Sequence, residues 1–167
     1  KYLKTDYRIA SGMDYTIFDD NVGYIRCKSF LNNTGAGNLD NIFLYMQPCR
    51  GLIIDIRNNG GGNVNNAEEL AARFTNEELL VGYIQHKTGT GHDDFSSLQP
   101  QHLKPGKGIR WQKPVIILTN RSVYSAANEF VKYMKCCPKD KVVGDKTGGG
   151  AGLPFSSELP NGWSIRF

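Results

Sequence analysis

Ser125 is the residue whose neighbours best suit covalent chemistry. It is followed by Ala126 and Ala127, and residues 124–137 have the apolar spacing of a helix. A serine at the start of a helix lies beside main-chain N–H groups that have no partner within the helix, and the helix dipole favours negative charge there. The Ala126 N–H is therefore a candidate donor to the oxyanion that forms when Ser125 attacks a carbonyl. Such a serine can also act only as a helix cap, and position alone does not decide between the two.

Three consecutive glycines, Gly60 to Gly62, are the second feature that suits chemistry. Residues without a Cβ can turn successive N–H groups toward one anion, as in an oxyanion hole or a phosphate nest. A tight turn between a strand and a helix would also use glycines, so the triplet alone favours neither interpretation.

Other motifs do not complete a recognisable site. The segment 144–147 hints at a phosphate loop, but Asp145 occupies a position where the Walker A motif needs glycine. No spacing fits a metal site, so we expect no metal and no cofactor. We interpret the cysteines as buried or incidental thiols. The residues considered for a metal site are His86, His92, His102, Cys27, Cys49, Cys136 and Cys137.

The composition is that of one folded domain. The chain has 167 residues, of which 40% are hydrophobic and 22% charged, and this length can bury a sizeable core. Its longest aliphatic run, 115–118, is far shorter than the roughly 20 residues that cross a bilayer, so no membrane span is expected. The net charge of +4 comes from scattered residues, which gives little support to a nucleic-acid partner. The oligomeric state stays open.

Two strand–loop–helix units must position the serine and the glycines. Residues 51–57 are expected to form a buried strand, followed by the glycine loop and a helix over 66–74 with an asparagine cap. A second strand over 115–119 is followed by a polar turn, the helix over 124–137 and a short strand at 142–143. This alternation predicts an α/β fold of crossover units, in which ligands bind at the carboxyl ends of the strands.

The rest of the chain is expected to frame these units. Residues 87–113 are polar and rich in glycine, serine and proline, so we expect a long excursion on the surface. The other expected elements are a hairpin of strands 15–18 and 22–30, a helix over 39–46, a strand over 79–86 and a strand over 163–167.

The segments 22–30, 51–62, 114–129 and 142–147, in this order, together resemble the C-terminal processing (tail-specific) serine peptidases. Relatives of that family include tricorn and the interphotoreceptor retinoid-binding protein. The resemblance implies a ClpP/crotonase-like α/β core and hydrolysis of peptide bonds in polypeptide substrates. It also implies a bacterial protein that acts outside the cytoplasm. Carried over by position, Ser125 would be the nucleophile, and the N–H groups of Gly62, Gly61 and Ala126 would form the oxyanion hole.

The sequence departs from this family at the general base. In the tail-specific branch, a lysine 25 residues after the serine accepts its proton, and here 125 + 25 = 150 is Gly150. Glycine cannot accept a proton, so a Ser-Lys dyad at this position is excluded. The tricorn-like branch uses a histidine from before the core and an acidic residue further along the chain. We therefore expect residues 1–167 to be a single but incomplete peptidase core domain, inactive alone, whose base comes from outside this segment.

Three functions follow from these observations. The leading one is a serine endopeptidase core with a main-chain oxyanion hole. The alternative is a catalytically inactive peptide- or lipid-binding module of the same fold, since the retinoid-binding relative carries apolar ligands. A crotonase-type enzyme acting on an acyl-CoA thioester would use the same oxyanion chemistry, but no acid/base carboxylate accompanies the glycine loops.

Overall fold

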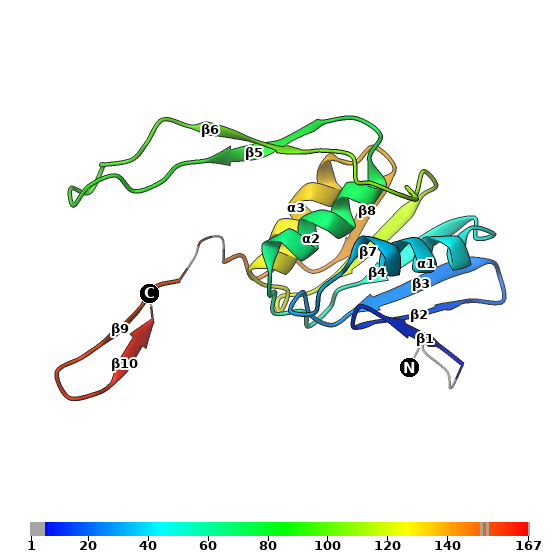
Figure 1. Ribbon diagram of the computed structural model, residues 1–167, viewed down its shortest axis with the longest axis horizontal. Coiled ribbons are helices and arrows are strands. Elements are labelled where there is room, and N and C mark those ends of the chain that lie inside the picture. The colour runs from blue at the N-terminus through cyan, green and yellow to red at the C-terminus, as the bar shows by residue number, and fades with distance from the viewer. Residues whose placement is uncertain (1–5, 151, 153, 167) are drawn as a thin grey trace.

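A mixed six-stranded sheet forms the centre of the structure (Figure 1). The computed structural model describes residues 6–150, 152 and 154–166, so Phe167, the end of the last expected strand, lies outside the described residues. The sheet has the strand order β1-β2-β3-β4-β7-β8. Its strands are β1 (Arg8–Ala10), β2 (Met13–Ile17), β3 (Val22–Cys27), β4 (Gly51–Asp55), β7 (Val115–Thr119) and β8 (Asp140–Gly144).

The parallel half of the sheet is built from strand–helix crossovers. Strands β3, β4, β7 and β8 run parallel to one another, whereas β1 and β2 are added antiparallel. Along the chain, each new parallel strand is placed on the same side of the one before it, in the order β3, β4, β7, β8. Because crossovers between parallel strands are right-handed, the helices that connect these strands all lie on one face of the sheet (Figure 1). The expected α/β class is confirmed. The helices are α1 (Ala36–Met46), α2 (Val64–Ala71) and α3 (Ala126–Cys136).

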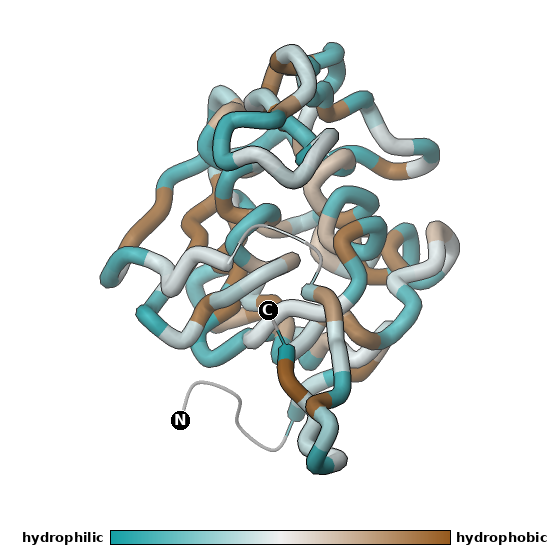
Figure 2. The backbone as a smooth tube through the Cα atoms, turned by 90° about the vertical axis from the view of Figure 1, so that its left-hand side faces the viewer, coloured by the Kyte–Doolittle hydropathy of each residue, from teal (hydrophilic) through white to brown (hydrophobic). Residues whose placement is uncertain are grey.

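The main core lies between this sheet and its helices. Ile54 in β4 and Ile117 in β7 are fully buried, whereas the neighbouring Ile116 is 39% exposed, because side chains of a strand alternate between its two faces. Phe130 of α3 packs on Phe30 with ring centroids 5.6 Å apart. Figure 2 shows hydrophobic stretches inside the molecule and mostly hydrophilic outer loops.

Two hairpins lie outside the central sheet, and one corrects the sequence prediction. The segment 87–113 is not only a loop, because β6 (Gln99–Leu103) pairs antiparallel with β5 (Leu79–Ile84). The sequence of β6, QPQHL, lacks the β-branched and aromatic residues that signal a strand. β9 (Ser156–Glu158) and β10 (Ser164–Arg166) form the second hairpin, which projects from the core on the same side as the tip of β5 and β6 (Figure 1).

The helix that follows the glycine loop begins earlier than expected. Asn63 is its N-cap, and the Asn63 side chain accepts a hydrogen bond from the Asn65 N–H. The residue expected to lie at the start, Asn66, is buried within the first turn, and its Nδ2 donates to Phe30 O at 2.8 Å. The last turn is the 3₁₀ helix η1 (Ala72–Phe74). Several asparagines in a row made the cap ambiguous from sequence alone.

The partly buried carboxyl group of Asp140 lies at the start of β8, shortly after α3. Asp140 Oδ2 is buried and has no hydrogen-bond partner among the described residues. Burial raises the pKa of Asp140 to about 7, although a hydrogen bond with the Cys137 thiol lowers it. The pKa of an aspartate in the unfolded chain is about 3.9. The folded state therefore binds the Asp140 proton more tightly than the unfolded state does. Protonation of Asp140 stabilises the fold fully below about pH 4, and this stabilisation is lost as the pH rises through about 7.

We expect Asp140→Asn to remove this contribution to the pH dependence of stability. Relative to the wild type, the variant should become more stable as the pH rises from about 5 to about 8, because a neutral amide replaces a buried group that must ionise. Thermal unfolding of both proteins at the two pH values measures the change. Asp19→Asn, which removes an exposed carboxylate, is the control variant measured in parallel. A constant difference for Asp140→Asn would contradict the assignment.

Candidate functional site

The loops that follow the four parallel strands lie side by side in the order of those strands. Phe30 pairs in parallel with Gly62 beyond β3 and β4, and Tyr124 pairs in parallel with Gly149 beyond β7 and β8. The two pairs are joined because the Tyr124 N–H donates to Asn59 O at 3.1 Å. The glycine loop and the serine turn therefore meet at the carboxyl edge of the sheet, where the crossover topology predicts a site.

Ser125 occupies the N-cap position of α3, but its side chain does not cap the helix. It precedes α3 with φ 55° and ψ −126°, and its side chain makes no capping hydrogen bond. Its N–H donates to Gly149 O at 2.9 Å, while its half-buried Oγ has no hydrogen-bond partner in the part of the chain that the structure describes. A non-glycine residue in this region of φ and ψ is strained. Sharp, strained turns between a strand and a helix are also how nucleophilic serines are held with Oγ free.

Gly61 packs directly on the serine turn. A Cβ at this position would lie 2.7 Å from Tyr124 O, 2.9 Å from Ser125 Cβ and 3.0 Å from Ala126 N. Its φ of +103° is also one that side-chain-bearing residues rarely adopt. Only glycine fits at position 61. The main chain of the glycine loop therefore contacts both Ser125, which precedes α3, and Ala126, the first residue of α3.

The three candidate N–H donors are not equivalent. The Gly61 N–H donates to Asn59 Oδ1 at 2.9 Å and is therefore engaged. The pairing with Phe30 uses Gly61 O and the Asn63 N–H. In a parallel ladder this leaves the N–H of the residue between them, Gly62, directed away from Phe30. Among the described residues, neither the Gly62 N–H nor the Ala126 N–H donates a hydrogen bond.

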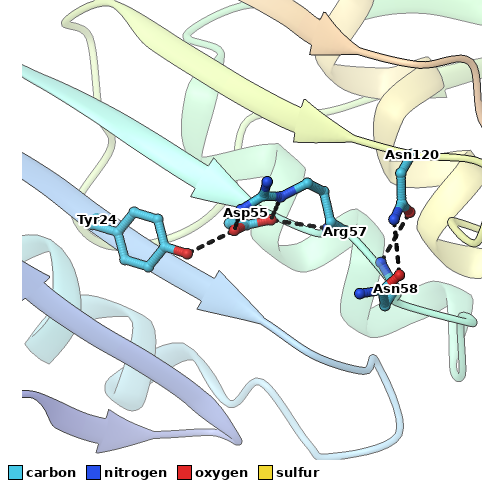
Figure 3. A network of polar contacts seen from close by, with 5 residues as sticks. All are labelled: Tyr24, Asp55, Arg57, Asn58 and Asn120. Carbon is cyan, nitrogen blue, oxygen red and sulfur yellow. Dashed lines mark hydrogen bonds and ion pairs between the residues drawn. The ribbon is translucent and has the colours of Figure 1, made fainter. Parts of the chain in front are cut away.

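A pair of asparagines fastens the two loops to each other (Figure 3). The Asn58 N–H donates to Asn120 Oδ1 at 3.0 Å, and Asn120 Nδ2 donates to Asn58 Oδ1 at 2.8 Å. Asn58 adopts φ 66°, a left-handed conformation that asparagine tolerates better than most residues. This reciprocal contact was not predicted, because residues 62 positions apart give no local sequence signal.

A buried carboxylate, paired with a partly exposed arginine, fixes the start of the glycine loop (Figure 3). Asp55, at the end of β4, is 3% exposed and accepts hydrogen bonds from Arg57 Nε at 2.8 Å, Arg57 Nη2 at 2.6 Å and the Tyr24 hydroxyl at 2.6 Å. Burial alone would raise the pKa of Asp55, but the hydrogen bonds from Arg57 and Tyr24 outweigh it and hold this pKa below its usual range. The carboxylate therefore stays charged and positions Arg57, the residue before Asn58.

A tyrosine ring fills the space beside the position where the family's lysine would stand. A Cβ on Gly150 would overlap the ring of Tyr124, and Gly150 has φ +81°. A lysine at position 150 would therefore be obstructed in two ways. Among the described residues, Ser125 Oγ is not hydrogen-bonded to any basic or acidic side chain, so the general base remains unassigned by the geometry.

The comparisons with known proteins agree with this site. Residues 21–167 match the family described as Peptidase family S41. A protein of Staphylococcus epidermidis (strain ATCC 12228 / FDA PCI 1200) named "Probable CtpA-like serine protease" is 31% identical over 149 residues, which are 88% of this chain and 29% of that protein. The chain thus spans under a third of the length of this curated relative.

Solved structures share the fold. A crystal structure of a protein from Parabacteroides merdae ATCC 43184 is 52% identical, with a TM-score of 0.93, over 99% of this chain and 53% of that chain. The photosystem II D1 C-terminal processing protease is 23% identical, with a TM-score of 0.61, over 87% of this chain and 36% of that chain. At this level of identity, the second likeness concerns the fold alone.

Gly61→Ala is expected to disrupt the junction of the two loops. The new Cβ would overlap Tyr124 O and Ser125 Cβ at a positive φ, which costs about 1–3 kcal/mol or more of stability. Gly60→Ala is the matched control, because a Cβ on Gly60 meets nothing within 4 Å. Thermal unfolding and labelling of Ser125 by a fluorophosphonate measure the two effects. Equal stability and equal labelling for the two variants would contradict the contact.

The contact between Tyr124 and Gly150 can be tested in the same way. Gly149 and Gly150 share φ +81°, but a Cβ on Gly149 meets nothing within 4 Å. Gly150→Ala should therefore be more destabilising than Gly149→Ala, by up to about 1 kcal/mol, because the exposed Tyr124 ring must shift to admit the new Cβ. Replacing Tyr124 by alanine should abolish that difference, as chemical unfolding of the single and double variants would measure. A difference that persists without the ring would remove this explanation.

Proposed function

The chain belongs to peptidase family S41, and on this premise we propose that it is the core of a serine endopeptidase that hydrolyses peptide bonds of polypeptide substrates. One observation carries the proposal. Ser125, with an unengaged Oγ on a strained turn, lies against Gly61, and the N–H groups of the adjoining residues Gly62 and Ala126 have no acceptor among the described residues. This is the set of groups that acyl transfer by a serine requires.

In the proposed reaction, Ser125 Oγ attacks the scissile carbonyl carbon, and a base removes the hydroxyl proton. The carbonyl oxygen becomes an oxyanion that accepts hydrogen bonds from the N–H groups of Gly62 and Ala126. The N-terminal end of α3 adds a favourable dipole at the same point. We assign no donor role to the Gly61 N–H, because Asn59 Oδ1 already accepts its hydrogen bond. Loss of one oxyanion donor in a serine peptidase lowers the rate by about a hundredfold or more.

The base is proposed to come from outside residues 1–167. Gly150 replaces the lysine of the tail-specific branch, and the Tyr124 ring occupies the adjacent space, which supports a histidine supplied as in the tricorn-like branch. The chain spans 29% of the curated relative's length, which supports treating it as a part of a single core domain rather than a complete enzyme. The finer fold assignment is ClpP/crotonase-like, supported by helices on one face and loops that lie side by side beyond each parallel strand.

The place of action is proposed to be outside the cytoplasm of a bacterium, as the family resemblance implies. Among the described residues, no helix has both the length and the apolar character required to cross a membrane. The alternative function, an inactive peptide- or lipid-binding module, is favoured by a single observation. Ser125 Oγ contacts no basic or acidic group in the described residues.

Ser125→Ala in the full-length protein should abolish cleavage of an unstructured polypeptide. Stability should change by no more than about 0.5 kcal/mol, because the Oγ makes no hydrogen bond among the described residues. Ser125→Gly should also be inactive but more stable than the wild type, because glycine relieves the strain at φ 55°. Ser122→Ala, at an exposed serine three residues earlier, is the control and should retain activity.

Two outcomes separate the candidate functions. Fluorophosphonate labelling at Ser125, together with loss of cleavage in Ser125→Ala, supports the peptidase. Unlabelled but peptide-binding full-length protein supports the inactive module. Cleavage that persists at the wild-type rate in Ser125→Ala would remove this serine as the nucleophile.

A further inference from the structure

We propose that Asn59 is the positioning residue of the oxyanion hole, because it holds the glycine loop and the serine turn at the same time. The proposal rests on the function proposed for Ser125. It concerns a residue that contacts neither the substrate carbonyl nor the serine hydroxyl, but that determines where the two main-chain donors lie.

Every polar group of Asn59 is engaged. The residue is fully buried. Its N–H donates to Ile56 O at 3.0 Å, and its own carbonyl accepts from the Tyr124 N–H at 3.1 Å. Its side chain donates from Nδ2 to Cys27 O at 3.1 Å and accepts at Oδ1 from the Gly61 N–H at 2.9 Å. Such a fully bonded amide in a dry environment has one orientation, because each lost hydrogen bond would leave a buried polar group unpaired.

The side chain of Asn59 orients the glycine loop. Because the Gly61 N–H points to Oδ1, it cannot point toward the carbonyl of a substrate. Nδ2 anchors the same amide to Cys27 O, at the end of β3. The next N–H along the chain, that of Gly62, is then the one left on the side away from Phe30. The amide therefore selects which glycine donates.

The main chain of Asn59 orients the second donor. The hydrogen bond from the Tyr124 N–H to Asn59 O holds the residue immediately before Ser125. Ala126, whose N–H is the second donor, follows Ser125 directly, and the N–H lies where a Cβ on Gly61 would be only 3.0 Å away. One residue thus sets the distance between the Gly62 and Ala126 N–H groups, which must converge on one oxygen.

Only asparagine meets both demands at this position. The site needs a donor toward Cys27 O and an acceptor toward the Gly61 N–H, within a short side chain. Aspartate keeps the acceptor but places a buried carboxylate against a carbonyl oxygen, which lowers stability. Alanine loses both contacts, although it introduces no buried charge. These two substitutions therefore separate an effect on catalysis from an effect on folding.

The test uses Asn59→Asp and Asn59→Ala in the full-length protein. For Asn59→Ala we expect kcat to fall about 10- to 100-fold while KM changes less than about threefold, because the donors are misplaced only for the oxyanion. Asn59→Asp should retain more kcat than Asn59→Ala despite its lower stability. Inhibition by a peptide aldehyde, whose adduct carries an oxyanion, should weaken in parallel with kcat. Thr75→Ala, which removes two hydrogen bonds of a buried side chain at the turn before β5, is the control and should lower stability only.

A second measurement needs no substitution. Amide hydrogen exchange in the wild-type protein should show the Gly61 amide protected before any ligand is added, since it is hydrogen-bonded to a buried side chain. The Gly62 and Ala126 amides should gain protection only when the peptide aldehyde binds. This measurement tests the proposal even if both Asn59 variants fail to fold.

The outcomes separate this proposal from the function on which it rests. An aldehyde that never binds, or a fully active Ser125→Ala, would overturn the peptidase itself. An active, Ser125-dependent enzyme overturns the role of Asn59 if Asn59→Ala keeps kcat within about twofold of the wild type. An unprotected Gly61 amide, or a Gly61 amide that becomes protected only with the aldehyde, overturns it as well.

Discussion

The contact of the Gly61 main chain with the serine turn is the constraint on which the site depends. A Cβ here would meet Tyr124 O, Ser125 Cβ and the Ala126 N at 2.7–3.0 Å, so the main chains of the two crossover units lie too close together for any side chain at this position. This contact brings the main chain of the glycine loop against Ser125 and the Ala126 N–H. It also leaves no room for adjustment, and the strain at Ser125, with φ 55°, must be compensated by the surrounding hydrogen bonds.

The compensation comes from polar groups that form layers behind the contact. Asp55, with Arg57 and Tyr24, fixes the end of β4 through short hydrogen bonds to a buried carboxylate. Beyond it, Asn58 and Asn120 join the two loops side by side. These layers lie at the carboxyl ends of parallel strands, where the main chain leaves the sheet and its N–H groups become available. The hydrophobic core beneath supplies stability, while the polar layers supply the orientation that catalysis needs.

The sequence predicted the elements better than their contacts. Hydrophobic runs such as 52–54 and 115–118 identify strands of the central sheet, although Ile116 on its outer face is exposed, and glycine triplets identify loops, because both are local properties. Strand β6 was missed, since QPQHL carries no strand signal and forms only because β5 offers a partner. The role of Asn59 was missed for a related reason. Its partners Cys27 and Tyr124 are remote in sequence. Asn59 also bonds to their main-chain groups, which every residue type carries, so the identity of the partner residues gives no signal.

The groups that surround Ser125 limit the directions from which a proton acceptor could approach its hydroxyl. Gly61 packs on one side of the serine, Gly149 O accepts the serine N–H, and the Tyr124 ring lies over Gly150. A side chain at position 150 would have to displace that ring, whereas a Cβ on Gly149 would meet nothing within 4 Å. A side chain from elsewhere can reach the hydroxyl only from a direction that these groups leave open. In the function proposed above, Ser125 Oγ, which has no hydrogen-bond partner among the described residues, would be the nucleophile, and its activation would need a base from outside residues 1–167.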